Sequence, residues 1–491
     1  MTSAQQRRHP LRRRPLRRRA SATALLLATA ALLTTAAHAN ATGPRTEPAA
    51  ATGRHAALEG VWRMDGYGTL VTIHGTRLRT YATTAVSCLP GTAGGTRAGR
   101  PDADGRTEFD APDAARITVT PDGRNRAELR FADNAGWREL HRTAALPENC
   151  RRRPGKDPRT VFDVFWHTYA ENYPFFAAKG IDWDAVRDRY RPRITAETTD
   201  DQLFGVLRDM IEPLHDVHTS IEAGPGRSFG GLREDTTMPT DDSIARIDNA
   251  TAESVGVEQR RWGQGAIAYA DLPGRIGYLR LTRFTGFTDK GGYPGDVAEL
   301  DRALDNVFTA ARTEGPRALR GLVIDLRFNG GGSDQLGLRL ASRLTDRGFL
   351  AYTKHARNDP ADPRKFTAGR PVQVRPYDGP AYTGPVTVLT GRLSVSAAET
   401  FTQSLMGRTP APTRIGENTQ GAFSDTLERK LPGGWTFELP NEEFLTADGR
   451  TFDGAGIPPH LRTPVFTDEE FEQHRDSALT RARVLLAGKG G

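Results

Sequence analysis

Two short apolar runs, each leading into a turn and then a helical pattern, constrain the fold of this chain more than any other feature. Residues 321–328 read GLVIDLRF and precede NGGGSD, and residues 385–390 read PVTVLT and lead into SVSAAETF. Short continuous apolar runs of this kind indicate buried strands. Apolar residues at helical spacing precede the first run at 297–311 and follow it at 334–344. The alternation of strand and helix predicts a layered α/β domain that begins near residue 275.

The rest of the chain divides into segments of different composition. Residues 57–150 hold short alternating stretches broken by glycine, with a hairpin pattern around Pro121-Asp122-Gly123, and predict a small all-β domain. Residues 157–225 carry an aromatic stripe at helical spacing and then a second apolar stripe, and predict a helical segment. We therefore expect a chain of mixed class, α+β and α/β. The other expected segments are a linker at 40–56, an irregular connection at 226–274, the α/β core at 275–465 and a C-terminal helix at 466–491.

The N-terminus has the pattern of an export signal. An arginine-rich run at 7–19 precedes an apolar stretch rich in Ala and Thr that ends in Ala37-His38-Ala39. This order is typical of a signal peptide, here residues 1–39, and predicts no integral membrane span after cleavage. The alternative is a disordered basic tail. Paired arginines leave the general secretory route and the twin-arginine route both open. The prediction is an exported protein, whether secreted, extracellular or periplasmic.

Charge and cysteine content narrow the classes of function. The formal net charge is +7, but the arginine-rich run accounts for it, so the remaining chain is close to neutral and a nucleic-acid partner has little support. Cys88 and Cys150 form an even pair in a chain bound for an oxidising compartment, which predicts a disulfide, with two free buried thiols as the alternative. Neither cysteine has the spacing of a structural zinc site, and we expect no metal and no cofactor.

The segment SVSAAETF raises the question of what Ser396 does. A Ser followed three residues later by Glu399 is a capping box, which only begins a helix. The same position also suits a nucleophile, because the N–H groups at a helix start are unpaired. Residues 330–332 are three glycines after a buried strand, so their N–H groups can converge on an anion, as an oxyanion hole requires. A simple turn is the alternative.

Residues 214–221, LHDVHTSI, place two histidines close together. His218 is a candidate base for Ser396, because an activated Ser needs an imidazole within hydrogen-bond reach. A lone histidine is more often a structural residue. His215 and His218 could also hold a metal at i, i+3, but no third ligand is evident.

Four segments together resemble the tail-specific (C-terminal processing) serine protease superfamily over residues 275–465. They are GLVIDLRFNGGG, SVSAAETF, GENTQGAF and DGRTFDGAGIPPH. The helical segment with DWDAVRDRY and DVHTSI resembles that of the tricorn-core-like branch. The resemblance implies a crotonase/ClpP-like catalytic core and hydrolysis of peptide or protein substrates by a serine-type endopeptidase. The stretch from 226 to 274 is short for the PDZ domain that many members insert, so none is expected.

The resemblance also implies the roles of individual residues. Ser396 stands at the nucleophile, His218 at the general base of the tricorn-like branch, and Asp453 where the acid, often Glu, is found. The N–H groups of Ala397 and of Gly331 or Gly332 stand at the oxyanion hole. The other branch uses a Lys base in a Gly-Lys-Gly, where this chain has Gly421-Ala422-Phe423, so a Ser/Lys pair is not expected. The Ser that precedes the base in the tricorn-like set is Val217 here, which leaves the fourth member open.

Two other classes of function stay open on sequence alone. The first is a non-catalytic ligand- or peptide-binding protein on the same fold, because fold does not fix function. The second is a crotonase-like acyl-CoA enzyme, which shares the glycine turn but would not need Ser396 and His218. The presence of Ser, His and an acid at the matching positions favours the exported serine peptidase.

Overall fold

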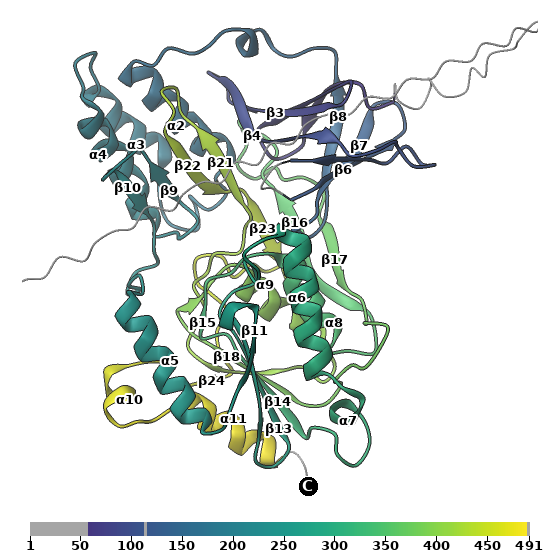
Figure 1. Ribbon diagram of the computed structural model, residues 1–491. Helices are drawn as coiled ribbons and strands as arrows, with labels where there is room; N and C mark the ends of the chain where they lie inside the picture. Colours follow the sequence, from purple (N-terminus) through teal and green to yellow (C-terminus); the bar gives the residue numbers. More distant parts are fainter. Residues whose placement is uncertain (1–56, 112–114, 489–491) are drawn as a thin grey trace, which may run out of the picture. The chain divides into compact units, whose positions relative to one another are not determined.

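The computed structural model describes residues 57–111 and 115–488 (Figure 1). All of them fall within one unit, Ala50–Gly491. The predicted signal peptide at 1–39 and linker at 40–56 lie outside the described residues. Across the two described ranges, no helix is both long and apolar enough to cross a membrane.

The predicted β domain is a closed barrel of eight antiparallel strands in sequential order. The hairpin expected around residues 121–123 is formed by β6 and β7. Alternate side chains such as Trp62, Leu129 and Leu140 are fully buried inside the barrel. The barrel strands are β1 (Gly60–Met64), β2 (Thr69–His74), β3 (Arg77–Thr83), β4 (Cys88–Arg97), β5 (Thr107–Asp110), β6 (Ile117–Asp122), β7 (Arg126–Phe131) and β8 (Arg138–Thr143).

A disulfide joins Cys88 to Cys150, as predicted, with the two Cα atoms 4.7 Å apart. Cys88 begins β4, and Cys150 lies in the short 3-10 helix η1 (Glu148–Arg151) just after the last barrel strand. The bond therefore fastens the chain that leaves the barrel to its fourth strand.

The helical segment consists of α2 (Pro158–Asn172), α3 (Trp183–Tyr190) and α4 (Asp200–Ile211). Each helix begins at a side-chain cap, supplied by Asp157, Asp182 and Thr199. The aromatic stripe of α2 packs into a core that it shares with the barrel and with a late hairpin of the chain. That hairpin, β21 (Thr426–Lys430) and β22 (Thr436–Pro440), joins β9 (Ser220–Glu222) and β10 (Ser228–Gly230) in a sheet of order β10-β9-β22-β21.

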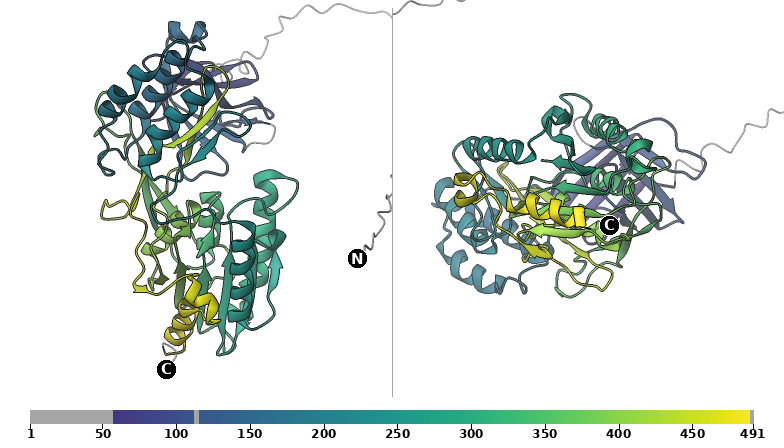
Figure 2. Two further views of the ribbon diagram at one scale, coloured as in Figure 1. Left: turned by 90° about the vertical axis from the view of Figure 1, so that its left-hand side faces the viewer. Right: turned by 90° about the horizontal axis from the view of Figure 1, so that it is seen from below.

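The α/β core is built on a seven-stranded sheet of order β11-β12-β13-β14-β18-β20-β24. Neighbouring strands from β13 to β24 are parallel. One face packs against α6, α8 and α9 and the other against α5 and α11, so the sheet lies between two helical layers. Figure 2 shows the yellow C-terminal helices against the sheet. The strands are β11 (Arg260–Trp262), β12 (Ile267–Leu272), β13 (Ile276–Leu281), β14 (Gly321–Asp325), β18 (Val386–Thr390), β20 (Thr413–Gly416) and β24 (Leu461–Arg462), and the helices are α5 (Asp241–Val255), α6 (Gly292–Val307), α7 (Ala310–Thr313), α8 (Asp334–Ser342), α9 (Ala397–Ser404), α10 (Asp468–Glu472) and α11 (Ser477–Gly488).

Two smaller sheets lie beside the main one. β15 (Phe328–Asn329) pairs with β19 (Leu393–Ser394), which brings the segments after β14 and β18 together. The other sheet has the order β17-β16-β23 and consists of β16 (Phe349–Ala356), β17 (Arg370–Val374) and β23 (Glu442–Leu445).

The structure corrects two expectations about segments. Residues 226–274 are not irregular, because they contain α5 and the strands β11 and β12 of the main sheet. Thr240 begins α5 with a capping box. The apolar face of α5 is narrow, which explains why hydrophobic periodicity alone did not predict this helix. The C-terminal helix expected at 466–491 is two helices, α10 and α11, which Asp476 separates by capping the second with its side chain.

Candidate active site

Ser396 lies at a strained turn between β19 and α9. Its backbone has φ 56° and ψ −116°, a region that a residue with a side chain seldom occupies. The Ser396 N–H donates to Glu399 Oε2 at 3.1 Å, so the predicted pairing of these two residues is present. Ser396 also borders a cavity of about 1430 Å³. The turn therefore presents this residue to open space, which a purely structural helix cap does not require.

The glycine turn after β14 lies directly against Ser396. A Cβ atom on Gly331 would fall 2.6 Å from the Ser396 Cβ, and a Cβ on Gly332 would fall 2.5 Å from the Phe284 backbone. Both glycines have positive φ, 85° and 131°. The turn thus needs glycine at these two positions both for its conformation and for the close approach.

Two backbone donors beside Ser396 are free. The N–H of Gly331 donates to Asn329 Oδ1 at 2.9 Å and is already used. For the N–H groups of Gly332 and Ala397, no acceptor exists among the described residues. Free N–H groups at a helix start and in a glycine turn attract a negative oxygen.

Glu399 holds the Ser396 turn to a second loop, a role that the sequence did not reveal. Its buried carboxylate accepts from the N–H of Gly421 at 2.6 Å and of Ala422 at 2.9 Å as well as from Ser396. Burial raises the pKa of Glu399 to about 7, although the N–H donors favour the charged form. The bonds to Gly421 and Ala422 join residues more than 20 positions apart, so the local capping pattern gave no signal for them.

His218 borders the same cavity as Ser396. Burial lowers the pKa of His218, while the charges of Asp216 and Asp425 act in the opposite direction. The imidazole Nδ1 has no hydrogen-bond partner within the described part of the chain. No hydrogen bond joins His218 to Ser396 either, and such a bond often tightens only when substrate is bound. The structure therefore brings the predicted nucleophile and base to one cavity, where burial favours the neutral form of the imidazole.

The turn that carries His218 is fixed by Asp216. One oxygen of this buried carboxylate accepts the His218 N–H at 3.0 Å, and the other accepts the hydroxyl of Tyr173 at 2.9 Å. Gly231 packs so closely behind the turn that a Cβ there would lie 2.2 Å from the Asp216 carbonyl oxygen. His215, by contrast, is exposed and contacts Glu234. The Tyr173 contact spans 43 positions, so sequence reasoning missed it.

Asp453 lies near the site, but its carboxylate is engaged elsewhere. It accepts the Phe423 N–H at 3.3 Å and the Thr451 hydroxyl at 2.6 Å. Burial raises the pKa of Asp453 well above its usual value. The acids whose charge reaches His218 are Asp216 and Asp425. The described residues contain no hydrogen bond between Asp453 and His218.

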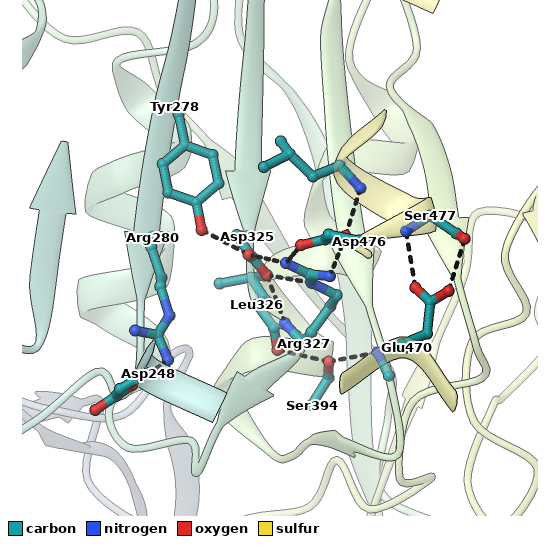
Figure 3. A network of polar contacts seen from close by, with 12 residues as sticks. Asp248, Tyr278, Arg280, Asp325, Leu326, Arg327, Ser394, Glu470, Asp476 and Ser477 are labelled. Carbon is teal, nitrogen blue, oxygen red and sulfur yellow. Dashed lines mark hydrogen bonds and ion pairs between the residues drawn. The ribbon is translucent and has the colours of Figure 1, made fainter. Parts of the chain in front are cut away.

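The hydroxyl of Ser394, two residues before Ser396, is already used in structural hydrogen bonds. The residue is fully buried, its hydroxyl donates to the Leu326 carbonyl at 2.7 Å, and it accepts the Gly391 N–H at 3.0 Å (Figure 3). Figure 3 also shows Arg327 between the carboxylates of Asp325 and Asp476. These contacts fasten the segment just after β14, which leads to the glycine turn, to β19 and to the start of α11.

A buried lysine lies on the other side of the cavity wall. Lys354 Nζ contacts Asp425 at 2.9 Å and Glu442 at 3.0 Å. Burial lowers the pKa of Lys354, but these carboxylates outweigh it and raise the pKa above the usual value. Lys354 is therefore held protonated and cannot accept a proton from Ser396. Lys430, the first Lys after Ser396, is exposed on β21 and is not part of the cavity wall.

One group of side chains has the composition of a metal site. Asp65, Glu139 and His141 of the barrel each offer one potential ligand atom, and these three atoms lie within 4.8 Å of one another. Arg63 contacts Asp65 at 2.7 Å and Arg370 contacts Glu139 at 2.9 Å, so guanidinium groups already neutralise both carboxylates. A divalent cation would have to displace these arginines, and the group does not border the Ser396 cavity.

Two family models match this chain, one over the α/β core and one over the helical segment. Residues 275–463 match the family model "Peptidase family S41", and residues 154–212 match "Tricorn protease C1 domain". The Carboxy-terminal processing protease CtpA of Bacillus subtilis (strain 168) is 25% identical over 239 residues, 46% of each chain. The present chain thus matches about half the length of that curated relative.

A solved structure supports the same assignment at the level of fold. A candidate peptidase from Parabacteroides merdae ATCC 43184 is 25% identical with a TM-score of 0.55, and the match covers 68% of this chain and 97% of that one. The chain belongs to the tail-specific protease family, peptidase family S41, with a tricorn-like helical segment before its core.

Proposed function

We propose that the protein is an exported serine peptidase that forms an acyl-enzyme at Ser396. One observation carries the proposal: Ser396 is strained at a turn between two free N–H donors and shares a cavity with His218, whose pKa burial lowers. The buried and occupied Ser394 is no competitor, and Lys354 is held protonated. The proposal also implies that the mixed α/β core has a crotonase/ClpP-like fold.

The proposed reaction has two balanced halves. His218 takes the proton of the Ser396 hydroxyl while the oxygen attacks the peptide carbonyl, and the oxyanion is held by the N–H groups of Gly332 and Ala397. His218 then gives the proton to the leaving amine, the C–N bond breaks, and an ester remains on Ser396. Water attacks the ester with His218 again as base, which releases the acid and restores the hydroxyl. Gly331 could add a third donor only if its bond to Asn329 opened.

The third member of the catalytic set is proposed as Asp453, from its position in the sequence. Its present partners, Thr451 and Phe423, would have to yield for it to reach His218. Asp216 is the alternative that the contacts offer, because it already orients the His218 backbone and its charge favours the imidazolium. An Asp453→Asn variant that keeps full turnover would leave this role to Asp216.

Export and cleavage after residue 39 complete the proposal. The Cys88–Cys150 disulfide supports an oxidising compartment, and peptide or protein substrates are expected outside the cytoplasm. Sequencing the N-terminus of the processed protein should give Asn40 as the first residue.

The decisive experiment is covalent labelling. A fluorophosphonate probe should label the wild-type protein, and mass spectrometry should place the adduct on Ser396. Ser396→Ala should abolish labelling while the thermal unfolding temperature stays close to that of the wild type. Absence of labelling in a folded wild-type protein would favour the non-catalytic binding protein instead.

A further inference from the structure

The tip of the β7–β8 hairpin of the barrel lies beside the glycine turn of the active site. The Ser333 hydroxyl donates to the Asp133 carbonyl at 2.6 Å. Gly332, whose N–H is one of the two free donors, directly precedes Ser333. Asp133 and Ser396 both line the cavity of about 1430 Å³. The barrel therefore places a residue with a carboxylate close to the position where the carbonyl of a substrate is expected.

The carboxylate of Asp133 has no cation of its own. It is half-buried, and no other residue in the described ranges donates a hydrogen bond to it or forms an ion pair with it. The other Lys and Arg residues that line the cavity, Lys290 and Arg429, are no exception. Burial raises the pKa of Asp133, and the charge of Asp425 raises it further, while the charge of Arg138 acts in the opposite direction. A charged carboxylate in such a place is costly unless a cation pairs with it.

The buried cations near Asp133 are committed to other carboxylates. Arg138 contacts Asp425 at 3.1 Å. Lys354 contacts Asp425 at 2.9 Å and Glu442 at 3.0 Å. Two cations thus balance two carboxylates, and Asp133 adds a negative charge that they do not offset.

The wall around Asp133 suits the long stem of a basic side chain. Tyr293, at the start of α6, lines the same cavity. Burial raises the pKa of Tyr293 to about 12, and the charge of Asp133 contributes to the increase, so the phenol lies within reach of this carboxylate. An aromatic ring beside a carboxylate can bind both parts of a basic side chain, the apolar stem and the cationic head.

We propose that Asp133 determines the specificity of cleavage: its carboxylate binds the ammonium or guanidinium group of a lysine or arginine that flanks the scissile bond. The inference rests on the proposed function, since the peptide is the one that acylates Ser396. The contact offsets the charge of Asp133 only when substrate is bound, so it favours basic residues over neutral ones of the same length. Because Asp133 belongs to the barrel, this domain contributes to the choice of substrate.

The test compares substrates that differ by one charged group. β-casein serves as an unfolded protein substrate, and mass spectrometry of its fragments gives the cleaved bonds, most of which should have lysine or arginine on one side. Two peptides are then copied from such a site, one with lysine and one with norleucine, which has the lysine stem without the ammonium group. The wild type should cleave the lysine peptide with a kcat/KM about tenfold or more higher, because a close charge pair is lost in the other.

Variants of Asp133 assign this ratio to one carboxylate. Asp133→Asn keeps the shape of the side chain and removes its charge, so the ratio should fall close to one, mainly by slower cleavage of the lysine peptide. Asp133→Glu should restore most of the preference. Asp122→Asn is the matched control, because Asp122 is an exposed aspartate of the barrel that is not part of the cavity wall, and it should keep the wild-type ratio. The thermal unfolding temperature of Asp133→Asn should not fall, since the lost carboxylate has no partner in the free protein.

Fluorophosphonate labelling of Ser396, measured in parallel, separates this inference from the proposed function. A wild-type protein that is neither labelled nor cleaves β-casein refutes both. A labelled wild type that leaves β-casein intact, cleaves it without regard to basic residues, or cleaves the two peptides equally refutes the role of Asp133 alone. A full ratio in labelled Asp133→Asn refutes it as well. If Asp133→Asn is not labelled, Asp133→Ala takes its place: a ratio near one there and a high ratio in Asp133→Glu support the proposal, and equal ratios in the two refute it.

Discussion

At the scale of the residue, the contact between Gly331 and Ser396 is the tightest constraint on the site. Gly331→Ala would place a methyl group 2.6 Å from the Ser396 Cβ at a φ of 85°, so either the serine or the turn must move. We expect a loss of about 100-fold or more in the rate of fluorophosphonate labelling, because small displacements of a nucleophile from its donors are costly.

Gly330→Ala is the control for this prediction. A Cβ on Gly330 meets no atom within 4 Å, and its φ lies outside the left-handed region. Its labelling rate should stay near that of the wild type. Equal losses in the two variants would show that the loop tolerates no side chain at all, and the specific contact with Ser396 would not be the cause.

His218 sets the expected pH dependence. A general base must be neutral, and burial lowers the pKa of His218, so the acidic limb of kcat/KM should have its midpoint below about 6.5, the usual value for His. His218→Ala should cost orders of magnitude in acylation, as loss of a triad base does. His215→Ala, the neighbouring exposed imidazole, should cost little. A pH profile with an alkaline limb alone would contradict a histidine base.

At the scale of the element, the ion pairs in Figure 3 fasten α11 to the sheet beneath the glycine turn. Arg327 and Asp476 are both buried, with their charged atoms 2.7 Å apart. Asp476→Ala should lower the free energy of unfolding by about 3–5 kcal/mol, because it leaves part of the charge of Arg327 unpaired in the interior. Chemical denaturation gives this value directly.

Asp468→Ala is the matched control on the preceding helix. Asp468 pairs with Arg246 at 2.7 Å, but its side chain is 82% exposed. Exposed pairs contribute about 0–1 kcal/mol, so this variant should unfold close to the wild type. Similar losses for the two aspartates would mean that the pair between Arg327 and Asp476 contributes no more than an exposed one.

The elements that the sequence predicted correctly are those whose formation depends on a few neighbouring residues. The two buried strands, the hairpin at 121–123 and the helix that begins after Ser396 were all readable, because apolar runs, turn residues and a capping box act over a few positions. Barrel closure was not readable, since it depends on the pairing of β1 with β8, some 80 residues apart. The same reason hid Glu399 as a clamp on Gly421 and Tyr173 as a support of Asp216.

At the scale of the whole molecule, the barrel and the core are joined through buried charge. Arg138 of β8 contacts Asp425 at 3.1 Å, and Lys354 of the core contacts the same carboxylate. Burial raises the pKa of Asp425, but Lys354 and Arg138 outweigh it and hold the pKa below its usual value. The barrel also touches the turn that carries Gly332, because the Ser333 hydroxyl donates to the Asp133 carbonyl at 2.6 Å.

Arg138→Met should therefore weaken both the stability and the activity of the protein. Asp425, which is half-buried, would keep Lys354 as its nearest cation, and removal of one partner of a buried ion-pair network costs about 3–5 kcal/mol. The stability that the lowered pKa of Asp425 supplies is present above about pH 3.8 and is lost as the pH falls below it, so the acid-unfolding midpoint of the variant should rise. Turnover of β-casein should fall as well, since the barrel forms one wall of the cavity.

Arg130→Met, at an exposed arginine on β7 that pairs with Glu128, should change neither quantity measurably. Acid titration and turnover of the two variants, measured side by side, would contradict a structural role of the barrel in the active site if Arg138→Met behaved like Arg130→Met.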